Sequence, residues 1–585
     1  MAPARARWGT AGAMGDRDGG DAGMIGASPG WILAGNVWGV MQRVSGHGGN
    51  HVVTVAQAHG VNVMFTLSGG HVFPLYDAAV KGPAPMRLVD VRHEQTAVFA
   101  AEATGRLTRD PGLAVVTAGP GVTNAISAVT SAYFNGAPLV VIGGRAPDYL
   151  WGRGALQEMD HVPLLTPVTK HAATVHDRLK VASSVNEAFA LAATPRRGPV
   201  FLDFPLETIY AEADSDIPAP ERLRPPAPPA DLIAQAGRLL AEARRPVLVL
   251  GSDVWLGRAE AAARACAEEL RLPVITNGQA RGIIPGGHEL LVSRARGLAL
   301  AEADLVIVAG TPLDFRLKYG AFGPKDAPAQ VVHVADAPEG LATHCTVAVG
   351  VAGGLESFFT GLAAFSSPGR RDQDWLSRLQ EAVRASAAAD APLLAAEADP
   401  IHPVRIYGEL LRQLADDAVV IGDGGDFVSF AGRHVEPGKP GNWLDPGPFG
   451  CLGTGMGYAA AARLARPSSQ VVLLLGDGAA GLSLMDADTL VRHKLPVVMV
   501  CGNNSGWGLE KWPMRAVYGY DVAADLAPQT RYDSVVAALG GAGELVTSPS
   551  QIAPALRRAF DSGVPYLVNV ITDPEVEYPR TTTGV

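Results

Sequence analysis

Short runs of branched apolar residues recur along this chain, and most of them end in glycine, aspartate or asparagine. From His51 onward, helix-prone segments separate the runs. This alternation is typical of parallel strands that helices cover on both faces. Because 585 residues exceed what one hydrophobic core supports, the sequence predicts an α/β protein of three doubly wound parallel-sheet domains.

The runs fall into three groups, and the stretches between the groups set the expected domain boundaries. A stretch rich in proline separates the first group from the second, and a polar stretch separates the second from the third. The expected order is a disordered extension (1–45), a first domain (46–213), a linker (214–230), a middle domain (231–364), a connector (365–400), a third domain (401–570) and a tail or lid (571–585).

Charge and composition exclude several classes of protein. A formal net charge of -10 argues against a nucleic-acid partner, since phosphate binding needs a basic face. The partly apolar segment 24–41 contains Pro29 and four glycines, so a membrane-spanning helix is a poor interpretation, although a peripheral membrane contact stays open. The cysteines lie far apart without CxxC spacing, which favours a reducing cytoplasm over a disulfide framework or a zinc site.

Two polar side chains follow neighbouring apolar runs in the third domain. Asp477 ends one run, and Asn504 ends the next run along the chain, with one expected helix between them. The carboxyl ends of parallel strands meet at one edge of a sheet, so both side chains should lie close together. Their oxygens suit Mg²⁺ shared with a phosphate group, while the glycines beside Asp477 let backbone amides approach phosphate.

Taken alone, a GDG or an NN pair usually marks a turn. Joined at this spacing, LLLGDGAAGLSLMDADTLVRHKLPVVMVCGNNSGWG resembles the cofactor motif of thiamine diphosphate enzymes. The resemblance implies that the carbonyl of Gly506 completes the metal site. It also implies cofactor contacts from Gly425, Asp426, Phe427, Gly476, Gly478, Ala479 and Asn504. Ala479 and Ala480 replace the Ser and Phe common in relatives, which we expect to alter packing rather than ligation.

Glu94 stands where an expected strand leads into an expected helix, within LVDVRHEQTAVFAAEATGRLTRDPGLAVVTAGPGVTNAISAV. By itself, a glutamate there suits the positive end of a helix dipole. The surrounding string resembles the pyrimidine-binding domain of the acetolactate synthase superfamily. The resemblance implies that Glu94 pushes the cofactor's pyrimidine to its imino tautomer, so that the cofactor's own amine can deprotonate the thiazolium. Gly119 and Asn124, in GPGVTN, are then cofactor-binding residues.

The resemblance covers residues 46–585 and implies pyrimidine-binding, middle Rossmann-like and diphosphate-binding domains. In relatives, a bulky third residue of a GxxG turn wedges the two cofactor rings into a V. Leu452 takes that place between Gly450 and Gly453, and the Gly450 carbonyl would accept the 4′-amine. Relatives form the site across a subunit interface, so the resemblance implies a homodimer or homotetramer.

Four segments are more specific than the motifs of the superfamily, and they resemble 2-hydroxyacyl-CoA lyases: HGGNHVVTVAQAHGVNVMFTLSGGHVFPLYDA, VIGDGGDFVSFAGR, WLDPGPFGCLGTG and AGTPLDFRLKYG. Such enzymes split a 2-hydroxyacyl-CoA into an aldehyde or ketone and formyl-CoA, and the reverse condensation is known for the class. Glu510, six residues after Asn504, matches the position of a catalytic glutamate in pyruvate-decarboxylase-type relatives. A lyase needs such an acid–base group to deprotonate the substrate's 2-hydroxyl. The competing interpretation is an exposed helical residue that pairs with Lys511 or Arg515.

Three further polar residues are expected near the site without a settled role. His71 in SGGHVF is either a second polar group that faces the substrate or a structural histidine. Gln157 and Lys170 match positions that acetolactate synthases also use, so they do not separate the two activities.

Relatives bind an adenine nucleotide in the middle domain, FAD in the synthases and CoA in the lyases. Arg281, Arg316 and Lys318 are candidate phosphate contacts there, although isolated cations are commonly surface charges. The tail EVEYPRTTTGV resembles the lid of the lyases. Two alternatives to a lyase acting on an acyl-CoA stay open. One is an acetolactate synthase that condenses two molecules of the 2-oxoacid pyruvate with FAD bound. The other is a non-catalytic member, suggested by the two alanines after GDG and by Asp486.

Overall fold

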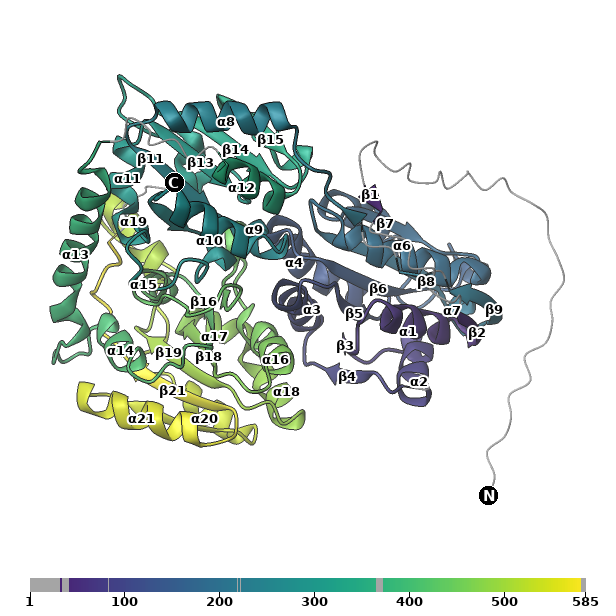
Figure 1. Ribbon diagram of the computed structural model, residues 1–585. Coiled ribbons are helices and arrows are strands. Elements are labelled where there is room, and N and C mark those ends of the chain that lie inside the picture. The colour runs from purple at the N-terminus through teal and green to yellow at the C-terminus, as the bar shows by residue number, and fades with distance from the viewer. Residues whose placement is uncertain are drawn as a thin grey trace.

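Three parallel sheets form the framework of the molecule, as the sequence predicts (Figure 1). The computed structural model describes residues 32–33, 42–82, 84–217, 219–220, 223–364 and 372–579. Central strands such as β5, β11 and β18 are buried along their whole length, because helices cover both faces of each sheet. The fold class is therefore α/β with three doubly wound domains.

The N-terminal domain contains a six-stranded parallel sheet. In sheet order its strands are β4 (Arg87–Asp90), β3 (Val63–Thr66), β5 (Gly112–Val116), β6 (Leu139–Arg145), β8 (Pro199–Pro205) and β7 (His171–Thr174). Its helices are α1 (Gly48–Ala58), α2 (Phe73–Lys81), α3 (Glu94–Thr108), α4 (Pro120–Asn135), α5 (Val162–Leu165), α6 (Val181–Ala193) and α7 (Leu206–Tyr210).

The C-terminal domain repeats this strand order in a second six-stranded sheet. Its strands are β17 (Trp443–Leu444), β16 (Val419–Asp423), β18 (Val471–Gly476), β19 (Val498–Asn503), β21 (Tyr566–Ile571) and β20 (Ala542–Val546). Its helices are α14 (Pro403–Leu410), α15 (Asp426–His434), α16 (Gly455–Ala465), α17 (Asp477–Ser483), α18 (Ala487–Arg492), α19 (Gly508–Tyr518), α20 (Tyr532–Ala538) and α21 (Pro549–Asp561).

The middle domain has five parallel strands: β12 (Val274–Thr276), β11 (Pro246–Leu250), β13 (Leu305–Ala309), β14 (Gln330–Ala335) and β15 (Val349–Ala352). Its helices are α8 (Ala230–Glu242), α9 (Ser252–Leu256), α10 (Glu260–Glu269), α11 (Arg296–Glu302) and α12 (Leu355–Ala363), and α13 (Trp375–Leu394) leads to the C-terminal domain. The strand order reverses at β11, and ligands of such sheets bind beyond the carboxyl ends of the strands at that point.

The N-terminal and C-terminal domains share one apolar core across helices α3 and α16. Figure 1 shows α3 and α4 on the side of the N-terminal domain that faces the other two domains. Gly457 makes the close approach of α3 and α16 possible, because a Cβ there would lie 2.7 Å from the carbonyl oxygen of Thr96. The helix that begins with Glu94 is thus held directly against the C-terminal domain.

The ends of the domains differ in detail from the expected boundaries. Most of the expected extension, including nearly all of segment 24–41, lies outside the described residues. The short strand β1 (Ile32–Leu33) pairs with β10 (Leu223–Arg224). The ordered domain begins before residue 46, because β2 (Gln42–His47) pairs with β9 (Glu212–Ile217), and this pairing also takes residues 214–217 from the expected linker. Among the described residues, no helix is long and apolar enough to cross a membrane.

Candidate active site

The carboxyl edge of the C-terminal sheet holds Asp477, as its spacing predicts. Asp477 follows β18 directly and is 2% exposed. Its two carboxylate oxygens accept hydrogen bonds from the backbone of Gly478 (3.0 Å) and Gly506 (3.2 Å). Burial raises the pKa of Asp477 to about 7, and the charge of Asp426 adds to the shift. The loop after β19 is therefore tied to the end of β18.

Asp426 and Asn504 join this edge from two other elements. The side-chain amide of Asn504 donates to Asp426 at 2.9 Å, and burial raises the pKa of Asp426. Gly508 is required here, because a Cβ on it would lie 2.1 Å from the Asp426 carboxylate. Asp426, Asp477 and Asn504 thus form one polar group, although they are far apart in the sequence.

These residues fit a hard cation that is shared with a diphosphate. Asp426 lies close enough to Asp477 to raise its proton affinity, so the pair favours bound positive charge. Carboxylate, amide and carbonyl oxygens are the ligands that Mg²⁺ prefers. A Cβ on Gly476 or Gly450 would meet nothing within 4 Å, which leaves room beside the edge. No group of three or more His, Cys, Asp or Glu side chains in the described ranges could hold a metal ion, so the candidate site relies on Asn504 and the Gly506 carbonyl as well.

The remaining cofactor candidates of this domain surround the same edge. Gly425 and Phe427 flank Asp426 at the start of α15, and the Phe427 ring packs against Tyr407 with centroids 5.2 Å apart. Ala479 is buried beside the Asp477 turn and Ala480 lies in the shared core, in keeping with the packing role expected for both alanines.

Asp423 is a residue of the site that the sequence reasoning missed. It ends β16, is fully buried, and accepts hydrogen bonds from the backbone of Gly453 (3.0 Å) and Gly455 (2.8 Å). Burial raises its pKa to about 6. Asp423 thereby fixes the turn that carries half-buried Leu452. An aspartate at the end of a buried run, VVIGD, was the available signal.

The carboxyl edge of the N-terminal sheet holds Glu94 at the first position of α3. Glu94 is 7% exposed, and its carboxylate accepts a hydrogen bond from the side chain of Asn124 at 3.0 Å. Asp486 steadies the same helix end from the C-terminal domain. Its carboxylate accepts from the backbone of Arg92 (2.7 Å) and the hydroxyl of Thr96 (2.6 Å), which flank Glu94.

Two of the three polar residues without a settled role, His71 and Gln157, form a second cluster with Thr117 at this edge. His71 is 8% exposed, and its Nδ1 lies 3.3 Å from the Thr117 hydroxyl, which donates to the Gln157 side chain at 3.3 Å. Burial lowers the pKa of His71, so the ring is neutral at pH 7. Gln157 also packs on the turn at Gly119, because a Cβ there would lie 3.0 Å from the Cβ of Gln157.

Glu510 lies in the first turn of α19 and is exposed in the single chain. The two cations considered as its partners form ion pairs elsewhere. Lys511 pairs with Asp525 at 2.9 Å, and Arg515 pairs with Asp521 and with Glu575. The helix begins soon after the loop that holds Asn504 and Gly506, so Glu510 closely follows, along the chain, the edge where the cation is expected.

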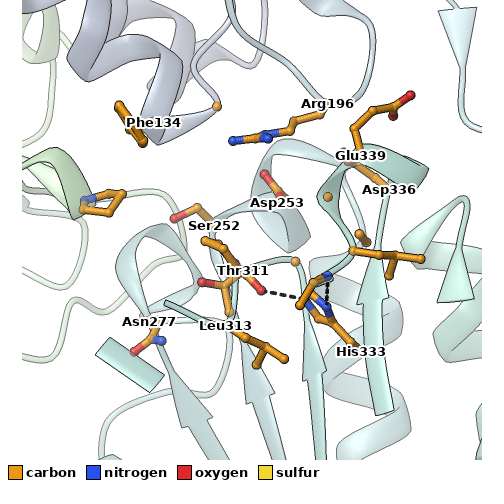
Figure 2. A pocket seen from close by; sticks show the side chains of 18 of the residues that line it. Phe134, Arg196, Ser252, Asp253, Asn277, Thr311, Leu313, His333, Asp336 and Glu339 are labelled. Carbon is orange, nitrogen blue, oxygen red and sulfur yellow. Dashed lines mark hydrogen bonds between the residues drawn. The ribbon is translucent and has the colours of Figure 1, made fainter. Parts of the chain in front are cut away.

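A cavity of about 220 Å³ opens beyond the strands of the middle sheet (Figure 2). Arg316 lines it, but its guanidinium pairs with Asp314 at 2.6 Å. Figure 2 shows Asp253, Asp336 and Glu339 on the same side of the cavity as Arg196. Burial raises the pKa of Asp253 to about 7, with a further contribution from Asp336.

Two other cations expected as phosphate contacts are not among the residues that line this cavity. Arg281 donates to the carbonyl oxygens of Gly432 and Val435 and stacks on Trp443, so it joins the middle and C-terminal domains. Lys318 is in a left-handed backbone conformation outside the lining. Lys170, which was expected near the active site, donates to the carbonyl oxygens of Leu191 and Thr194 at the end of α6, which gives it a helix-capping position. Arg281 and Lys170 therefore have structural contacts of their own.

The three sheets and the two polar edges fit a class of enzymes that bind a diphosphate cofactor. Models of known protein families match all three domains. The N-terminal TPP binding domain of thiamine pyrophosphate enzymes matches residues 46–164, the central domain matches 233–362 and the C-terminal TPP binding domain matches 423–570. The chain belongs to the thiamine pyrophosphate (thiamine diphosphate) enzyme family.

Relatives with two different names cover nearly the whole chain. The acetolactate synthase large subunit IlvG of Mycobacterium tuberculosis is 48% identical over 91% of this chain and 97% of the relative. The 2-hydroxyacyl-CoA lyase 2 of Caenorhabditis elegans is 35% identical over 92% of this chain and 90% of the relative. The human 2-hydroxyacyl-CoA lyase 2 is 34% identical, with 90% of each chain covered. The expected superfamily is confirmed, and the comparisons support both candidate activities within it.

Proposed function

We propose that this chain cleaves a 2-hydroxyacyl-CoA into an aldehyde or ketone and formyl-CoA, with thiamine diphosphate and Mg²⁺ bound. The observation that carries the proposal is Glu510 at the start of α19, just beyond the loop of Asn504 and Gly506. An acid–base group at this edge suits a reaction that moves a proton off a hydroxyl. The similarity to 2-hydroxyacyl-CoA lyase 2 along nearly the whole chain agrees with it.

The residues of both edges have distinct tasks in this reaction. Bound thiamine diphosphate supplies a nucleophilic carbon and an electron sink for bond cleavage. Asp477, Asn504 and the Gly506 carbonyl hold the metal, and Glu94 holds a proton at the pyrimidine. As the bond between C1 and C2 breaks, Glu510 takes the proton of the 2-hydroxyl and a carbonyl forms at C2. That proton balances the one gained by the carbon that becomes formyl-CoA.

Acetolactate synthesis from two pyruvates is the second candidate, and two observations favour it. The first is the 48% identity to an acetolactate synthase large subunit. The second is the acidic lining of the middle cavity, where Asp253, Asp336 and Glu339 lie together with Arg196 and an Arg316 that is already paired. Acidic side chains suit the free hydroxyls of a ribose, as in FAD, better than the 3′-phosphate of CoA.

We also propose that the active enzyme is a homodimer or homotetramer with its sites at the subunit interface. Within one chain, Glu94 bonds to Asn124 of the N-terminal domain, and Asp477 bonds to Gly478 and Gly506 of the C-terminal domain. Each carboxylate is thus held by its own domain. A cytoplasmic location is proposed as well, and the four free cysteines agree with a reducing compartment.

A substrate panel tests the proposal. The protein, loaded with thiamine diphosphate and Mg²⁺, is given 2-hydroxyacyl-CoAs of several chain lengths and, separately, pyruvate. Formyl-CoA and aldehyde are measured by mass spectrometry, and acetolactate by its conversion to acetoin. We expect formyl-CoA release that Glu510→Gln lowers by about a hundredfold, in the range of general acid–base catalysis. The remote, exposed Glu268→Gln serves as a charge-matched control and leaves the rate unchanged. Rapid acetolactate formation by a yellow, flavin-containing protein, without formyl-CoA from any substrate, would overturn the proposal in favour of the synthase.

A further inference from the structure

A buried histidine and aspartate lie next to the turn at Gly119 in the N-terminal domain. His161 precedes α5 and Asp203 lies in β8, and both side chains are 0% exposed. Nε2 of His161 accepts a hydrogen bond from the backbone N–H of Gly119 at 3.0 Å. Its Nδ1 lies 2.8 Å from a carboxylate oxygen of Asp203. The imidazole of His161 therefore bridges the Gly119 turn and strand β8.

These two bonds fix the tautomer of His161. A backbone N–H can only donate, so Nε2 must carry a lone pair. The proton of the neutral ring then resides on Nδ1 and is donated to Asp203. A doubly protonated imidazolium would lose the bond to Gly119, because both of its nitrogens donate. Asp203 thus orients the ring that holds the turn.

The turn at Gly119 needs such an anchor. Gly119 has φ 55° and ψ −109°, a conformation that residues with a Cβ rarely adopt. Helix α4 begins at the next residue, and Asn124, one turn later, donates to Glu94. On its other side the turn packs against Gln157, which bonds to Thr117. A shift of Gly119 would be passed to both polar groups of this edge.

Arg145 balances the charge of Asp203. Its guanidinium lies 3.5 Å from the Asp203 carboxylate and stacks on Trp151 with 3.9 Å to the ring centroid. Arg145 is 7% exposed. Arg145 also lies 3.5 Å from Asp160. Removal of Asp203 would disturb this whole ion-pair group, so substitutions at His161 give the cleaner test.

We propose that His161, oriented by Asp203, is a positioning residue that holds the Gly119 turn, and through Asn124 and Gln157 sets the geometry in which Glu94 meets the cofactor. His161 touches neither substrate nor cofactor in this scheme. The proposal concerns how the cofactor is bound and activated, so it is independent of the choice between lyase and synthase.

Two variants of His161 separate positioning from mere core packing. His161→Gln offers an oxygen near the place of Nε2 and can still accept from Gly119, whereas His161→Phe keeps the volume but removes both bonds. Cofactor affinity is measured by calorimetry on the apo-protein with Mg²⁺, and hydrogen–deuterium exchange at the reactive carbon of the bound cofactor by quenched-flow NMR. Neither readout needs a substrate. Thermal unfolding reports stability in parallel.

We expect His161→Phe to slow the exchange by about a hundredfold, because even a small misplacement of a reacting group costs that much. The variant should weaken cofactor binding less than it slows the exchange. His161→Gln should restore exchange to within about threefold of the parent, since an amide oxygen replaces the lost acceptor. His51→Phe is the matched control, because His51 is fully buried and bonds to the carbonyl oxygens of Gly46 and Ala213 away from the turn. It should lower the melting temperature and leave exchange unchanged.

Equal exchange in His161→Phe and the parent would overturn the proposal, as would equal losses in the Phe and Gln variants. If His161→Phe fails to fold, the Gln variant alone decides. Exchange within about threefold of the parent then supports the proposal, and a loss of tenfold or more in a stably folded protein refutes it.

Discussion

The N-terminal and C-terminal sheets have the same strand order, yet their carboxyl edges have opposite chemistry. The C-terminal edge gathers Asp423, Asp426 and Asp477, and burial raises the pKa of all three carboxyls. At the N-terminal edge, Glu94 lies among neutral hydrogen-bonding groups such as Asn124 and His71. One edge therefore suits a cation, and the other suits a proton shared with a ring nitrogen.

This difference shows that topology decides where a site lies and that side chains decide what it binds. Both edges are places where strands of a doubly wound sheet end in loops. A cation site requires several negative groups that lose their hydration together, whereas tautomer control requires a single carboxylate in a defined position. Substitutions at the two edges should therefore fail in different ways.

Asp477→Asn should have the largest effect. The amide keeps the size of the side chain but removes its charge and presents N–H groups where the cation needs oxygen. We expect activity to fall by about a thousandfold, since metal stabilisation is worth several kcal/mol, together with a loss of cofactor affinity measured by calorimetry. Asp488→Asn, on the partly exposed α18, is the control. A variant that kept normal affinity for Mg²⁺ and cofactor would remove Asp477 from the metal site.

Glu94→Gln should have the next largest effect, and it should lower the rate without an equal loss of cofactor affinity. The amide still fills the site beside Asn124 but cannot hold a proton at the pyrimidine. We expect kcat to fall by about a hundredfold or more, as for other acid–base groups, with cofactor affinity changed by far less. Steady-state rates and calorimetry on the same preparation give both numbers. Equal losses in rate and affinity would contradict the role assigned to Glu94.

Mixed oligomers of these two variants test whether the edges meet between subunits. Neither variant alone has an intact site. If Glu94 of one subunit serves Asp477 of another, each mixed dimer has one intact site and one with both substitutions. Random mixing should then recover about a quarter of the parent activity, because about half of the dimers are mixed. No recovery after verified subunit exchange would place both edges of a site within one chain.

The sequence predicted the C-terminal edge better than the N-terminal one, for a physical reason. Asp477 and Asn504 end consecutive runs, so their meeting follows from strand order and a short spacing. Asp423 was missed because its role depends on two backbone amides in a turn about thirty residues later along the chain. Likewise, His161 reaches Asp203 and Gly119 through tertiary contacts that no local pattern records. The fold class and the domain order follow from the alternation of strands and helices and from the chain length. The residues that support the site, such as Asp423 and His161, are recognised only in the three-dimensional structure.

Asp486 links the two edges, and its substitution should give the smallest effect. This carboxylate is 3% exposed and accepts from Arg92, Thr96 and the hydroxyl of Thr489. In Asp486→Asn, the amide group would face one of these donors, which we expect to lower the free energy of unfolding by about 1–3 kcal/mol.

The same substitution should also lower kcat by a few-fold, because the bonds from Arg92 and Thr96 flank Glu94 and their loss loosens the start of α3. Denaturant unfolding and steady-state rates measure the two effects, again with Asp488→Asn as the control. Asp488 pairs with Arg492 and with the side chain of Arg92 on the partly exposed face of α18, and such pairs contribute about 1 kcal/mol at most. If both variants lost stability equally and kept full kcat, the bonds from Asp486 would be ordinary domain contacts, and the two edges would act independently within a chain.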